Sequence, residues 1–160
     1  MATAHHNLSE FDTATVPSGT GKTFYLVVSE WNTAITEALY EGAVSVLTSF
    51  EVVPENIIRW NVPGSFELIY GAKKAQEKKP DAVIAIGSVI QGETPHFDFI
   101  CQGVAQGIKD LNVQSQVPVI FCVLTDNTLE QAQARSGGKH GNKGKEAAVA
   151  ALKMAALGQL

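Results

Sequence analysis

The stretch "AVIAIGSVIQGETPHFDFICQGVAQGIKDL", Ala82 to Leu111, determines the fold. It begins with a dense apolar run, 82–90, of the kind found in strands that are covered on both faces of a parallel sheet. Glycine and proline then interrupt the run, and the residues after Pro95 have helical spacing. The apolar positions on the expected helix face are Phe97, Ile100, Cys101, Val104, Ile108 and Leu111. We therefore expect a central strand followed by a helix that covers it.

The same order of strand and helix is expected on both sides of this unit. Asn32 or Thr33 is available to cap the first helix, and Pro80 ends the second. Strands that alternate with helices indicate right-handed crossover connections. The sequence thus predicts an α/β fold, a three-layer α-β-α sandwich with a four-stranded parallel sheet and helices on both faces. The other expected strands cover 23–29, 57–62 and 117–125, and the expected helices cover 33–50, 65–79, 95–111, 128–135 and 143–157.

Length and composition indicate one folded domain with an N-terminal extension. The chain has 160 residues, of which 45% are hydrophobic, and this is enough to bury one sizeable core. Residues 1–22 are rich in Thr, Ser, Gly and Pro and are predicted to form a flexible arm before a single domain, 23–160. His5 and His6 lie in this arm, where adjacent histidines without further ligands are expected to be solvated rather than metal-bound.

Charge, hydropathy and cysteine content exclude several classes of protein. A net charge of -4 gives no general electrostatic reason to bind nucleic acid or an anionic membrane surface. No apolar run approaches the roughly 20 residues that span a bilayer, and the N-terminus lacks the order of a secretory signal. Cys101 and Cys122 lie in apolar segments without ligand spacing, so we interpret them as reduced core residues of a cytoplasmic protein.

The expected loops at the carboxyl ends of the strands are where ligands collect in such sheets. Trp31 follows the first strand and is either a cover for the core or a flat wall for an aromatic ring. Glu67 lies after the second strand, where a carboxylate at a helix start is favourable in any case. His96 follows the third strand and is either a hydrogen-bond donor at the helix start or a base beside an anion pocket.

The loop after the fourth strand carries an uneven share of positive charge. "RSGGKHGNKGK", 135–145, holds four cations and a histidine without an acid. This run is either a solvated basic surface or an anion site, and its glycines favour the second interpretation because they permit backbone shapes that a solvated run does not need. Arg135 could bind a phosphate oxyanion through paired hydrogen bonds.

The common motifs of nucleotide, metal and serine-hydrolase sites are missing from the sequence. There is no P-loop, no Gly-x-Gly-x-x-Gly after a strand, no Gly-x-Ser-x-Gly and no cluster with metal-ligand spacing. We therefore expect neither a metal nor a cofactor. The residues indicate acid–base chemistry on a small phosphorylated substrate, with aromatic walls for a ring.

Four ordered motifs resemble the 6,7-dimethyl-8-ribityllumazine synthase family. They are "EWN", "VPGSFEL", "DAVIAIGSVIQGETPHFDFI" and "VLTDNTLEQAQARSGGKHGNKGKEAA", within about residues 23 to 157. The resemblance implies a flavodoxin-like fold and a cofactor-free transferase of riboflavin biosynthesis. The implied reaction joins 5-amino-6-(D-ribitylamino)uracil to 3,4-dihydroxy-2-butanone 4-phosphate and releases phosphate and water.

The resemblance also implies a role for particular residues. His96 would transfer protons and Arg135 would clamp the phosphate, with Arg135, Phe121 and Lys143 reaching in from a neighbouring subunit. Trp31 and Phe121 would enclose the pyrimidine, and Glu67 would accept hydrogen bonds from the ribityl chain. The implied substrate-binding residues are Trp31, Gly64, Ser65, Phe66, Glu67, Ser88, Val89, Ile90, Gly92, Glu93, Thr94, Phe121 and Lys143.

Two positions depart from the family pattern. The resemblance also implies that the chain assembles as a pentamer. Gln91 stands where a basic residue is usual, and Trp31 stands where phenylalanine is commoner. The run "RSGGKHGNKG" has no insertion, so twelve pentamers could pack into an icosahedral shell of sixty subunits. The N-terminal arm is expected to add a strand to a neighbour's sheet. The alternatives to an enzyme are a flavin-binding or storage protein, which would not need His96 or Arg135, and a purely structural shell.

Overall fold

The sheet has the parallel arrangement that the sequence predicts. A computed structural model describes residues 7–158, so His5, His6 and the start of the arm lie outside the described residues. Four parallel strands pair in the order β2-β1-β3-β4. The α/β sandwich is therefore confirmed. The strands are β1 Phe24–Ser29, β2 Ile57–Val62, β3 Ala82–Ile90 and β4 Val119–Asp126.

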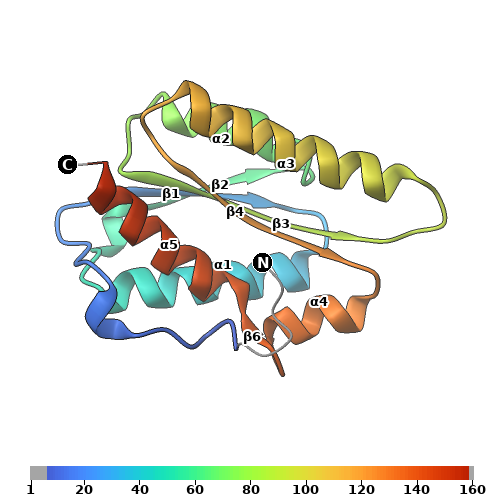
Figure 1. Cartoon of the computed structure of the whole chain (residues 1–160), viewed down its shortest axis with the longest axis horizontal. Helices are drawn as coiled ribbons and strands as arrows, with labels where there is room; N and C mark the ends of the chain where they lie inside the picture. The colour runs from blue at the N-terminus through green and yellow to red at the C-terminus, as the bar shows by residue number, and fades with distance from the viewer. Residues whose placement is uncertain (1–6, 159–160) are drawn as a thin grey trace.

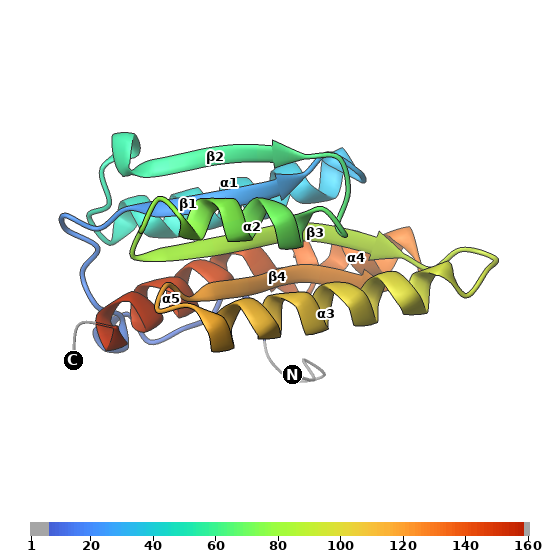
Figure 2. The same cartoon turned by 90° about the horizontal axis from the view of Figure 1, so that it is seen from above.

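Helices cover both faces of the sheet. In Figure 1, α2 and α3 lie above the sheet, and α1, α4 and α5 lie below it. Figure 2 shows the four strands side by side, with their carboxyl ends at the same edge. Loops that follow different strands are therefore neighbours at that edge. The helices are α1 Thr33–Ser49, α2 Leu68–Gln76, α3 His96–Gln114, α4 Leu129–Arg135 and α5 Lys143–Leu157, with short 3-10 turns η1 Thr13–Thr15 and η2 Pro54–Asn56.

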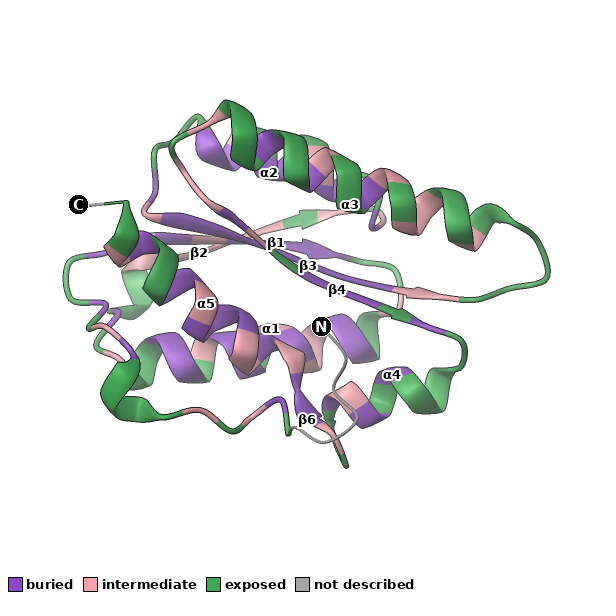
Figure 3. Ribbon diagram, in the orientation of Figure 1, coloured by how far each residue is buried: buried purple, intermediate pink, exposed green. Residues whose placement is uncertain are grey.

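The core consists of two apolar layers, one on each face of the sheet. β3 contributes to both, because Ile84 and Ile86 pack with α1 and α5 while Val83 and Ala85 pack with α2 and α3. Figure 3 shows this central strand buried, whereas the outer side of α3 is exposed. The prediction that 82–90 is a central strand is confirmed.

The two cysteines differ in burial. Cys122 on β4 lies in the core, and burial raises the pKa of its thiol to about 12. Cys101 on α3 is only half-buried, so its interpretation as a core residue was too strong. Both thiols are free.

The start and end of α2, the end of α3 (Gln114 instead of Leu111) and the capping of α1 differ from the sequence-based expectation. Ser65 and Phe66 precede α2 rather than beginning it, and Glu67 occupies the cap position without a side-chain cap bond. α2 also ends at Gln76 instead of continuing to Lys79: residues 77 and 78 form a turn, and Lys79 takes a left-handed φ of 54°, which no helix residue adopts. Asn32 precedes α1 as predicted, yet its side chain forms no cap bond.

A short hairpin within the cationic run was not predicted. It pairs β5 Ser136–Gly138 with β6 Gly141–Asn142. The segment that follows residue 6 lies against this hairpin: the Leu8 amide donates to the His140 carbonyl over 2.8 Å, and the Asn142 amide donates to Ser9 Oγ over 3.0 Å. Flexibility of residues 1–22 and their pairing with a neighbour stay predictions. No helix between residues 7 and 158 is both long and apolar enough to cross a bilayer.

Candidate active site

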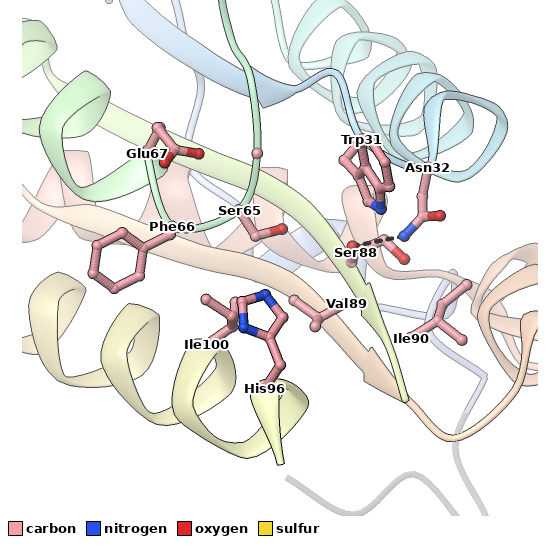
Figure 4. A pocket seen from close by; sticks show the side chains of 11 residues that line it. Trp31, Asn32, Ser65, Phe66, Glu67, Ser88, Val89, Ile90, His96 and Ile100 are labelled. Carbon is pink, nitrogen blue, oxygen red and sulfur yellow. Dashed lines mark hydrogen bonds between the residues drawn. The ribbon is translucent and has the colours of Figure 1, made fainter. Parts of the chain in front are cut away.

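A cavity of about 460 Å³ opens at the carboxyl edge of the sheet (Figure 4). It is formed by the loops after β1 and β2, the end of β3 and the first turns of α3. This is the position at which parallel sheets collect ligands. Its lining residues are Trp31, Asn32, Gly64, Ser65, Phe66, Glu67, Ser88, Val89, Ile90, His96 and Ile100.

Trp31 is a wall of the cavity and not a cover for the core. Its side chain is 71% exposed, which rules out the core alternative. The next residue, Asn32, has a φ of 59°, a left-handed conformation that asparagine tolerates better than most residues. The Asn32 side-chain Nδ2 donates to the Ser88 backbone carbonyl over 2.9 Å, the dashed line in Figure 4. This bond ties the loop that carries Trp31 to the end of β3.

The loop between β2 and α2 forms a second wall. Ser65 is buried, and its hydroxyl, like that of Ser88, has no hydrogen-bond partner among the described residues. Gly87 allows this packing, because a Cβ there would lie 2.7 Å from Ser65 Oγ. Glu67 is exposed at the cavity, and a Cβ at Gly64 would lie 2.9 Å from its Oε2. Close approach of this loop to β3 therefore depends on Gly87, whereas the exposed Glu67 carboxylate could shift to make room for a Cβ at residue 64.

His96 is the first residue of α3 and lines the cavity. The preceding residues Gly92, Glu93 and Thr94 do not line it; they are exposed in the loop that projects beyond the sheet in Figure 2. Within residues 7–158 the amides of these three residues donate no hydrogen bond. Free backbone amides next to the N-terminus of a 19-residue helix favour the binding of an anion there.

The three remaining predicted residues lie in a different cavity, of about 220 Å³. Phe121, Arg135 and Lys143 line it together with Leu8 and Asp126. Phe121 is 36% exposed on the edge strand β4, Arg135 ends α4, and Lys143 begins α5. The two cavities have no lining residue in common. A single chain therefore does not bring the ring-side residues and the cationic residues together.

The cations of the second cavity have carboxylate partners. Lys143 Nζ donates to Glu146 Oε1 over 2.6 Å, and Arg135 Nη1 lies 3.5 Å from Asp126 Oδ1. The Asp126 side chain is only 6% exposed, and burial raises its pKa while Arg135 opposes that shift. No group of three His, Cys, Asp or Glu between residues 7 and 158 is suited to hold a metal ion.

Sequence reasoning missed seven residues that line these cavities: Leu8, Asn32, Ile100, Val123, Leu124, Thr125 and Asp126. Asn32 was considered only as a helix cap, Ile100 only as part of an apolar helix face, and Asp126 was not considered. Asn32 and Asp126 each follow or end a strand at the carboxyl edge, and this position was the signal that could have found them.

Comparison with known proteins gives a consistent result over nearly the whole chain. Residues 21–159 match the model of a family described as 6,7-dimethyl-8-ribityllumazine synthase. A protein of that name from Christiangramia forsetii is 63% identical over 98% of this chain and 95% of its own. Another from Flavobacterium johnsoniae is 64% identical over 99% and 84% of the two chains, and one from Porphyromonas gingivalis is 58% identical over 98% of each.

Proposed function

The chain belongs to the 6,7-dimethyl-8-ribityllumazine synthase family, and we propose that its two cavities are the halves of one active site, each completed by a neighbouring subunit. The enzyme condenses 5-amino-6-(D-ribitylamino)uracil with 3,4-dihydroxy-2-butanone 4-phosphate and releases phosphate and water, the penultimate step of riboflavin biosynthesis. Membership of this family argues against the two alternatives, a flavin-binding or storage protein and a purely structural shell. One observation carries the proposal: the ring-side residues and the phosphate-side cations line separate cavities of the chain.

The larger cavity supplies the half that binds the pyrimidine. Its volume of about 460 Å³ lies in the range of sites for small molecules. Trp31 offers an exposed face for stacking on the ring, and Glu67 offers carboxylate oxygens to ribityl hydroxyls. The loop 64–67 and the end of β3, 88–90, enclose the ring and its chain.

The phosphate-binding half combines backbone and cations. The free amides of 92–94 and the N-terminus of α3 face the anion from one subunit. Arg135 and Lys143 of the neighbour add positive charge, and its Phe121 covers the second face of the pyrimidine. Gln91, at the start of the same loop, adds no charge.

The reaction then needs positioning and proton transfer. The 5-amino group attacks the ketone and forms an imine with loss of water. A proton leaves carbon as the phosphate departs with the electron pair of the C–O bond, and the ribityl-bearing nitrogen closes the ring with loss of a second water. His96 accepts and returns these protons, while Arg135 and the loop amides stabilise the departing phosphate. Holding the two substrates together supplies much of the remaining acceleration.

Replacement of His96 with glutamine is expected to lower kcat about tenfold and to leave KM for both substrates within about twofold. Proton transfer commonly contributes about 10²- to 10⁴-fold, but His96 is exposed, so water can carry part of the proton traffic. Steady-state rates of phosphate release and of formation of the lumazine chromophore measure kcat and both KM values. His140→Gln, in the hairpin turn outside both cavity linings, is the matched control. An unchanged kcat for the His96 variant would remove the residue from the mechanism.

The assembly that completes the site is a pentamer in the cytoplasm. The edge strand β4 carries the partly exposed Phe121, and α3 carries Phe99 and Val113, which are 71% and 79% exposed. Exposed apolar side chains on an unpaired edge and its neighbouring helix favour association. A ring of heterologous contacts would place each second cavity beside the next subunit's first cavity. The uninterrupted run 135–145 leaves a sixty-subunit shell of twelve pentamers open to the same chain.

Mixed assemblies test whether the site is shared. The Trp31→Ala/His96→Ala variant damages only the larger cavity, and Arg135→Ala damages only the smaller one. Random co-assembly of equal amounts leaves about one quarter of shared sites with two intact halves, so co-expression should restore about a quarter of wild-type activity. The two variants mixed without subunit exchange are the control. No recovery in co-expressed assemblies, or a solution mass of one subunit, would contradict the shared site.

A further inference from the structure

Asp126 is a buried carboxylate that the mechanism above does not use. It is the last residue of β4 and stands in register with Ile90 of β3. Its backbone carbonyl accepts the Gln91 amide over 3.0 Å, at the start of the loop that precedes α3. These two connections fix the residue to the sheet at its carboxyl edge.

The guanidinium of Arg135 is held at one nitrogen. Arg135 Nη1 donates to the Gln131 carbonyl over 3.2 Å and lies 3.5 Å from Asp126 Oδ1. Within residues 7–158, Nε and Nη2 of Arg135 donate no hydrogen bond. A guanidinium has five N–H donors in a rigid plane, so contacts on one nitrogen leave the others free to face a phosphate.

We propose that Asp126 is a positioning residue for the condensation, which holds Arg135 so that its free donors face the phosphate bound by the neighbouring subunit. The role rests on the proposed function of Arg135. The carboxylate is 6% exposed and its Oδ2 has no donor among the described residues, whereas the Arg135 side chain is 30% exposed. A buried carboxylate requires a nearby cation, so it restrains the more mobile partner.

The Asp126–Arg135 pair could also have the opposite effect and weaken phosphate binding. A carboxylate beside an arginine reduces the positive potential that attracts phosphate. Replacing Asp126 would then strengthen phosphate binding, whereas loss of a positioning residue weakens it. The direction of the change in KM therefore decides between the two effects.

Asp126→Asn in the assembled enzyme removes the charge and keeps the shape of the side chain. We expect KM for the butanone phosphate to rise about tenfold, in the range of coupling between contacting residues, and KM for the pyrimidine to stay within about twofold. Asp81→Asn is the matched control, because the Asp81 carboxylate lies 3.7 Å from Lys22 outside both cavity linings. Asp126→Thr, which suits a strand, repeats the test should the asparagine variant fail to fold.

A double-mutant cycle separates positioning from an independent role. In the Arg135→Ala background, Asp126→Asn should change KM for the butanone phosphate by less than about twofold, because its effect passes through the guanidinium. Additive effects, or an unchanged or lowered KM in the single Asp126 variant, would overturn the proposal. An unchanged KM for Arg135→Ala alone would instead refute the function proposed for Arg135, so the two failures are distinguishable.

Discussion

Arg135→Ala is expected to raise KM for the butanone phosphate about 100-fold and to lower kcat about tenfold, with KM for the pyrimidine nearly unchanged. Hydrogen bonds from a guanidinium to phosphate are charge-assisted and are about twice as strong as neutral ones. Removal of one such group from a partly desolvated site costs about 4 kcal/mol, and at 1.4 kcal/mol per factor of ten this corresponds to the roughly thousandfold loss in kcat/KM that the two changes make together. Arg135 lines the smaller cavity with its side chain 30% exposed, so it is partly shielded from water. Initial rates at varied concentrations of each substrate measure the two KM values.

The chain offers a close control for this substitution. Lys139 lies four residues further along the same cationic run but is exposed in the hairpin turn and lines neither cavity. Lys139→Ala removes the same unit charge, and its effect on KM should stay within about twofold because salt screens an exposed charge. Equal effects of the two substitutions would show that the run attracts phosphate only through its overall charge. Arg135 would then have no specific contact with the substrate.

The sheet could be predicted from sequence because its central strand is buried on both faces. The run 82–90 is apolar on both sides of the strand, and the structure gives β3 the same bounds. Ile57–Val62 was likewise predicted with the correct bounds. Parallel strands place the loops after them at one edge, so the positions of Trp31, Glu67 and His96 around one cavity followed from topology.

The features that could not be predicted depend on contacts between distant segments. The left-handed Asn32 is stabilised by the carbonyl of Ser88, 56 residues away, and nothing in the local sequence distinguishes this from a helix cap. The β5–β6 hairpin packs against residues 8 and 9, at the other end of the chain. The placement of Arg135 and Phe121 in a second cavity follows from where α4 and β4 lie, and only the resemblance had assigned them to a neighbour.

The contact between α1 and α5 has the most severe steric constraint near the site. Gly144 packs directly on the backbone of α1: a Cβ there would lie 2.7 Å from the carbonyl carbon of Leu39 and well inside van der Waals contact of its oxygen. The Asn142 side chain lies beside this contact. Its Nδ2 donates to the Ala38 and Ser136 carbonyls over 2.8 Å and 3.2 Å, and its Oδ1 accepts the Gly144 amide over 2.8 Å. Asn142 thus joins α1, the hairpin and the start of α5, which carries Lys143.

Gly144→Ala is therefore expected to lower the free energy of unfolding by about 3 kcal/mol, the upper range for overpacking a core, because backbone cannot move aside as a side chain can. For a domain of this size the loss corresponds to a fall in the thermal midpoint of about 10 °C. Gly158→Ala ends the same helix, where a new Cβ would meet nothing nearer than 3.7 Å, and its midpoint should stay within about 2 °C of the wild type. Circular dichroism melting curves of the wild type and the two variants measure the difference.

Separation of α5 from α1 would also displace Lys143 and the hairpin after Arg135, so any Gly144→Ala protein that folds should have a raised KM for the butanone phosphate. Equal midpoints for the two variants would show that α5 can shift away from α1 at no cost, and the rigid placement of the cationic residues would then have to come from the neighbouring subunit.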